Sequence, residues 1–101
     1  MAKSPPIAPT EESQIWDLID QLIETANNAS DQGLDAGAVH QAMMYACARY
    51  GAFIVASASE TVEDFVQDRD DAKRFYLDQF RRLLLENFDE YQENFGNYLD
   101  G

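Results

Sequence analysis

The sequence has a single cysteine, Cys47, and no proline after Pro9. One thiol cannot close an intramolecular disulfide, so no disulfide framework holds the chain together, and a reducing, cytoplasmic setting fits best. All three prolines stand within the first nine residues, and no apolar leader segment accompanies them. Because proline blocks a continuing helix, we expect residues 1–9 to form a flexible tail and residues 10–101 a single helical domain.

Basic side chains are also scarce. Seven Lys and Arg stand against nineteen Asp and Glu, which gives a net charge of −12. A chain this negative repels phosphate backbones and anionic lipids, so we expect no nucleic-acid partner and no membrane partner. The longest apolar stretch, residues 42–56, is too short to span a bilayer. The charge indicates an acidic, solvated surface; a further hypothesis is mimicry of nucleic acid toward a basic protein.

The sequence contains no recognisable catalytic or metal-binding set. One histidine and one cysteine cannot assemble the common zinc sites, and the Glu-x-x-His pairs of di-iron bundles do not occur. His40 and Cys47 lie two helical turns apart, about 10 Å, which is beyond the reach of a nucleophile and its base. The sequence therefore points away from an enzyme and predicts no catalytic residue, no metal site and no cofactor.

Apolar residues recur at helical spacing along the rest of the chain. This pattern predicts an all-α fold with three main helices in an antiparallel bundle. The expected helices cover about residues 10–30, 35–58 and 68–94. Residues 59–67 are ambiguous, because Ser59 or Thr61 is able to cap a short extra helix before the long C-terminal one.

The second expected helix is apolar around most of its circumference. Its large apolar residues are Val39, Met43, Met44, Cys47, Tyr50, Phe53, Ile54 and Val55. Such a helix must be surrounded, and two further helices of one monomer hardly suffice. We therefore predict a homo-oligomer, by default a symmetric dimer, or a complex with another protein. Within this apolar surface we expect Cys47 to be a buried structural thiol.

Arg49 is the only full charge between His40 and Ser59. We expect it to be buried and paired with a carboxylate of the first helix, the last helix or a neighbouring chain, because unpaired burial is costly. The alternative is a small-ligand or anion-binding pocket between helices, in which Tyr45 and Tyr50 supply hydroxyls. His40 points to the other side of the helix, so it joins such a pocket only from a second chain.

Two runs, residues 44–57 and 86–95, carry a family resemblance. The first reads Met-Tyr-Ala-Cys-Ala-Arg-Tyr-Gly-Ala-Phe-Ile-Val-Ala-Ser and the second Glu-Asn-Phe-Asp-Glu-Tyr-Gln-Glu-Asn-Phe. Over roughly residues 12–99 the chain resembles a small bacterial family of uncharacterised helical proteins, a domain of unknown function. The resemblance implies an all-helical fold and brings no activity or site residue. We expect a non-enzymatic protein that acts through self-association or protein–protein interaction.

Overall fold

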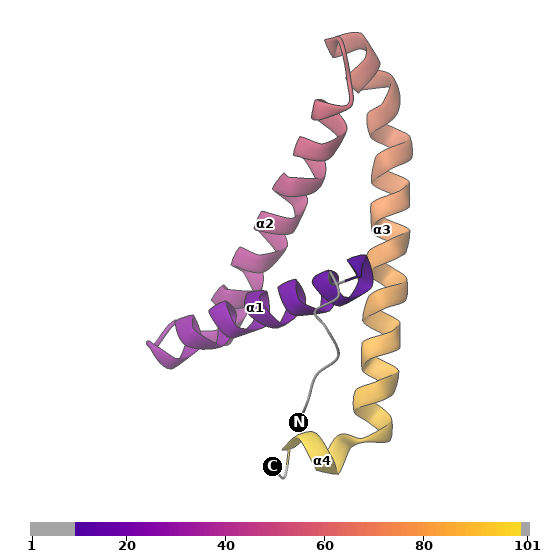
Figure 1. The fold of residues 1–101 in the computed structure, drawn as a ribbon. Helices are drawn as coiled ribbons and strands as arrows, with labels where there is room; N and C mark the ends of the chain where they lie inside the picture. The colour runs from indigo at the N-terminus through magenta and orange to yellow at the C-terminus, as the bar shows by residue number, and fades with distance from the viewer. Residues whose placement is uncertain (1–9, 100–101) are drawn as a thin grey trace, which may run out of the picture. The chain divides into compact units, whose positions relative to one another are not determined.

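The protein is described by a computed structural model that covers residues 10–99, with side chains for residues 10–97 (Figure 1). Its elements follow in the order α1 (Glu11–Asp31), α2 (Ala36–Ser57), α3 (Val62–Glu93) and α4 (Phe95–Leu99). No strand occurs within residues 10–99, so the predicted all-α class with three main helices is confirmed. The antiparallel bundle stays a prediction. The expected flexible tail, residues 1–9, lies outside the described residues.

Local interactions cap the start of α1 and shape the turn between α1 and α2. Thr10 caps α1, since its Oγ1 accepts a hydrogen bond from the Ser13 amide at 3.1 Å. At the other end Gly33 has a φ of 107°, a left-handed conformation that glycine adopts without steric cost. The Asp35 carboxylate then accepts a hydrogen bond from the Gly37 amide at 3.0 Å, which satisfies a free donor at the start of α2. These local hydrogen bonds explain why α1 and α2 begin where they do.

The short fourth helix follows the long one instead of preceding it. The candidate extra helix in residues 59–67 is absent as a separate element, because α3 already begins at Val62. Thr61 caps α3 by accepting a hydrogen bond from the Asp64 amide at 3.1 Å. Glu63 and Asp64 lie in the first turn, at the positive end of the helix dipole. These interactions favour one continuous helix over the two expected pieces.

The chain divides into two compact units within α2, between Cys47 and Ala48. In the first unit Val39 is buried, and the half-buried residues are Ala26, Ala29 and Ala38. In the second unit the half-buried residues of α2, the following turn and α3 are Gly51, Val55, Ser59, Phe65, Ala72 and Tyr76. The spacing of Gly51, Val55 and Ser59 marks the side of α2 that faces α3 in this unit. The expectation of a single domain stays a prediction.

Large apolar side chains remain exposed on every long helix. Among residues 10–97, Val39 is the one buried hydrophobic residue. The exposed residues include Ile15, Trp16 and Leu22 of α1, Met43, Tyr50, Phe53 and Ile54 of α2, and Phe75, Leu77 and Phe88 of α3. Burial of such side chains is the main driving force of folding and association. Neither unit therefore buries most of its own large apolar side chains.

Candidate interaction surface on α2

Charge is distributed very unevenly over the three long helices. The segment of α1 contains six acidic residues and no lysine or arginine, and that of α3 contains ten acidic and five basic residues. The segment of α2 contains no acidic residue at all, and its only ionisable basic side chains are His40 and Arg49. A long helix without carboxylates in a chain of net charge −12 is the least repulsive surface for another acidic molecule.

Arg49 is exposed, contrary to the expectation of a buried arginine. Its guanidinium forms no hydrogen bond or ion pair with the described residues, whose ion pairs all lie within α3. An exposed guanidinium stays hydrated and needs no carboxylate to offset desolvation. The expected pairing with α3, which belongs to the same unit as Arg49, is therefore wrong, and the pairing with α1 stays a prediction. Pairing with a neighbouring chain stays a prediction.

The other residues predicted around Arg49 are only partly gathered by the helix. Tyr45 precedes Arg49 by four positions, so helical periodicity places the two on the same side of α2. His40 precedes Arg49 by nine positions, which corresponds to about 180° around the helix, on the opposite side. The Tyr50 ring packs against Phe53 of its own helix, with ring centroids 5.9 Å apart. A pocket formed by all four predicted residues stays a prediction.

Cys47 is exposed, which overturns its expected role as a buried thiol. It belongs to a row of residues spaced alternately three and four positions apart, which we name the Cys47 face: His40, Met43, Cys47, Tyr50 and Ile54. All five residues are exposed. At about 100° per residue, the middle of this row lies roughly 90° around the helix from the Gly51 and Val55 side, and Cys47, four residues before Gly51, lies close to that side.

A shallow apolar groove lies between α2 and α3 in the second unit. Gly51, Val55, Phe65, Ala72 and Tyr76 are among its lining residues. A Cβ atom at Gly51 would lie 3.4 Å from the Tyr76 ring, an ordinary contact distance, so the ring packs closely beside the glycine. None of the four residues predicted for a ligand pocket lines this groove. Sequence reasoning missed it, although a glycine in the middle of an apolar helix is a known sign of close approach.

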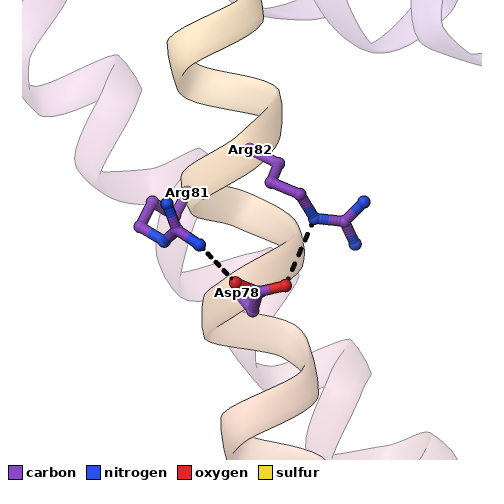
Figure 2. Close-up of polar contacts among 3 residues, drawn as sticks. All are labelled: Asp78, Arg81 and Arg82. Atoms are coloured by element: carbon purple, nitrogen blue, oxygen red, sulfur yellow. Dashed lines mark hydrogen bonds and ion pairs between the residues drawn. The ribbon is translucent and has the colours of Figure 1, made fainter.

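Five charged residues of α3 form ion pairs with one another. The Asp78 carboxylate accepts hydrogen bonds from Arg81 Nη2 at 2.5 Å and from Arg82 Nε at 3.2 Å (Figure 2). The hydrogen bond from Arg81, followed by the charges of both arginines, lowers the pKa of Asp78 below its ordinary value of 3.8. Asp71 and Arg74 form a further exposed pair. These interactions support the helix and do not form a binding site.

No group of three or more His, Cys, Asp or Glu side chains is arranged to hold a metal ion within residues 10–97. No helix of the described chain is both long and apolar enough to cross a membrane. The surface features that remain are the Cys47 face, the exposed Arg49 and the groove beside Gly51.

Comparison with known proteins agrees with the resemblance drawn from the sequence. A family model described as a protein of unknown function, DUF3144, matches residues 15–92. Neither a curated protein nor a solved structure matches the chain. The match confirms a family of unknown function and brings no activity, ligand or partner.

Proposed function

The chain belongs to the DUF3144 family of proteins of unknown function, and from this premise we propose that it works without catalysis, by binding copies of itself or another protein. A symmetric dimer is the default assembly, because two-fold closure is the commonest arrangement of soluble oligomers. We further propose a cytoplasmic location, which the single cysteine supports. The proposal includes no cofactor, no nucleic acid and no membrane partner.

The observation that carries the proposal is the exposed apolar surface of α2. Met43, Tyr50, Phe53 and Ile54 are all exposed on a helix that has no acidic residue. Fully burying one such side chain contributes about 1.5–3 kcal/mol. These side chains are already partly covered in the single chain, so burying the exposed remainder on two copies works against the roughly 4–15 kcal/mol that association costs in lost motional freedom.

Light scattering coupled to gel filtration tests this proposal on the full chain. We expect a molar mass at least twice the 11.4 kDa of one chain, falling on dilution. A basic protein mixture passed over the immobilised chain at low salt tests the protein-partner branch. A mass of one chain at every concentration, with no partner retained, would contradict the proposal.

A second candidate function is the binding of an anion or small acidic ligand at Arg49. It is favoured by the exposure of the guanidinium and by the lack of a carboxylate partner for it among the described residues. Tyr45, one turn away on the same side, would add a hydroxyl donor. Tyr50, and His40 from a second chain, complete the predicted set.

Titration with inorganic phosphate, followed by the NMR signals of α2, tests the anion site. We expect saturable shifts of Arg49 and Tyr45 that disappear in Arg49→Met. The matched control is Arg69→Met, which removes the same charge from α3. Shifts that are equally weakened by both substitutions would indicate screening by net charge and would exclude a site at Arg49.

A further inference from the structure

We propose that the groove beside Gly51 binds a small organic anion with an aliphatic tail, such as a medium-chain carboxylate. The groove lies entirely within the second unit and has a volume of about 350 Å³, at the small end of the roughly 300–1,000 Å³ of ligand pockets. This site differs from the anion site considered at Arg49, because Arg49 does not line the groove. Such binding requires no self-association of the chain, so the two proposals can fail separately.

Two unpaired cations line this groove. Three of the five basic residues of α3 form ion pairs with acidic residues of the same helix. The other two, Arg69 and Lys73, form no ion pair with any residue of the described range 10–97, and both line the groove. They stand four positions apart, so they lie one turn apart on the same side of α3. The cations of α3 that remain available to an anion are therefore gathered at the groove.

The charges around the groove favour a negatively charged head group. Asp70 is the one carboxylate among the lining residues, and the part of the lining that α2 contributes carries no charge. A carboxylate bound here is attracted by two cations within one helical turn and forms charge-assisted hydrogen bonds with them. The repulsion from the net charge of −12 acts from farther away and is largely screened beyond about 8–10 Å at physiological salt.

The floor of the groove suits an aliphatic tail. On α2 the floor runs from Ala48 to Val55, about 10 Å along the helix axis. Ala72 and Tyr76 line it on α3, and the Tyr76 ring packs beside Gly51. A narrow apolar floor between two helices accommodates an unbranched chain, and each methylene group that it fully buries strengthens binding about fourfold. Head and tail of such a ligand are thus each matched by one part of the groove.

Titration of the full chain with octanoate, followed by its methyl NMR signals at constant ionic strength, tests the site. We expect saturable shifts of Ala48, Ala52 and Val55. Acetate has the charge without the tail, and octanol has the tail without the charge, so we expect each to bind at least 10-fold more weakly. The signals of Leu22, an exposed residue of α1, report unspecific uptake by apolar surface.

The unpaired and paired cations of α3 provide matched variants. Arg69→Gln with Lys73→Gln removes both charges from the groove, and we expect octanoate to bind at least 10-fold more weakly. Arg81→Gln with Arg82→Gln removes the same charge from the same helix outside the groove, and we expect unchanged binding. Far-ultraviolet circular dichroism reports whether each variant keeps its helices.

A further variant blocks the tail and leaves both cations in place. Ala52→Phe puts a ring on the floor of the groove at an exposed position, so we expect the helices to remain and octanoate binding to be lost. This variant decides the question if the substitution of Arg69 and Lys73 unfolds the chain.

Four results would overturn the site. These are octanoate shifts that survive Ala52→Phe, equal weakening of binding by the two double substitutions, octanol that binds as tightly as octanoate, and shifts of Leu22 that follow those of Ala52. None of them bears on the mass measured by light scattering, so self-association is judged independently.

Discussion

The helices α2 and α3 differ most in their content of charged residues. The segment of α2 has no acidic residue, whereas that of α3 has ten acidic and five basic residues and forms ion pairs within itself. The ion pairs of α3 and its Thr61 cap each add a modest local contribution to the stability of that helix. An apolar helix such as α2 gains its stability from packing. The contrast teaches that α2 depends on packing more than α3 does, although both helices leave large apolar side chains exposed.

The largest effect on stability is expected at the contact between α2 and α3, where Gly51 lies beside Tyr76. Gly51→Leu places a branched side chain against the Tyr76 ring, and overpacking of this kind costs about 1–3 kcal/mol, of which the better helix propensity of leucine offsets up to about 1 kcal/mol. Urea unfolding followed by circular dichroism should show a lower midpoint. The control, Ala46→Leu, adds a leucine at an exposed position of the same helix and is expected to lower the midpoint less. Equal effects of the two leucines would show that packing of the Tyr76 ring beside Gly51 does not stabilise the protein.

A smaller effect is expected at the start of α3. Thr61→Ala removes the hydroxyl that accepts the Asp64 amide, and loss of such a cap costs about 1 kcal/mol. Thr25→Ala serves as the control, because the Thr25 hydroxyl bonds to the Gln21 carbonyl inside α1 and caps nothing. Amide exchange should accelerate in the first turn of α3 in the Thr61 variant alone. Unchanged exchange there would mean that α3 is held by its neighbours rather than by its own cap.

The smallest expected effect concerns pH. The folded pKa of Asp78 is lowered, first by its hydrogen bond from Arg81, so its contribution to stability is present above the ordinary value of 3.8 and is lost as the pH falls through the lowered pKa. Asp78→Asn should flatten the helicity profile in that acidic range and leave it unchanged near neutrality. Because Asp78 is exposed, the difference should be slight and should shrink with added salt. An equal acid transition in both proteins would exclude a role for this pair.

Local rules predicted the helices of this chain well. Thr10, Gly33 and Asp35 mark the ends of α1 and the start of α2, because capping depends on residues close in sequence. The expected helix began at residue 68 because the acids of the first turns drew attention from Val62, Phe65 and Val66, which already follow helical spacing. Thr61 followed by Glu63 and Asp64 was the signal that identifies the true start.

Side-chain environments were harder to predict than helices. Arg49 and Cys47 were expected to be buried, because an apolar helix is normally surrounded, yet both are exposed. Periodicity tells which residues share a side of a helix and does not tell whether anything covers that side. The contact of Gly51 with Tyr76 links residues far apart in the sequence, so hydrophobic spacing on either helix alone does not predict it.

The exposed apolar residues also have a calorimetric consequence. Unfolding raises the heat capacity in proportion to the apolar surface that becomes hydrated, and Val39 is the one hydrophobic residue classed as buried among residues 10–97. In the proposed assembly, most of the heat-capacity change should therefore accompany association rather than the folding of each chain. Heats of dilution measured at several temperatures should vary steeply with temperature, and the unfolding of dilute chains should give a broad, shallow transition.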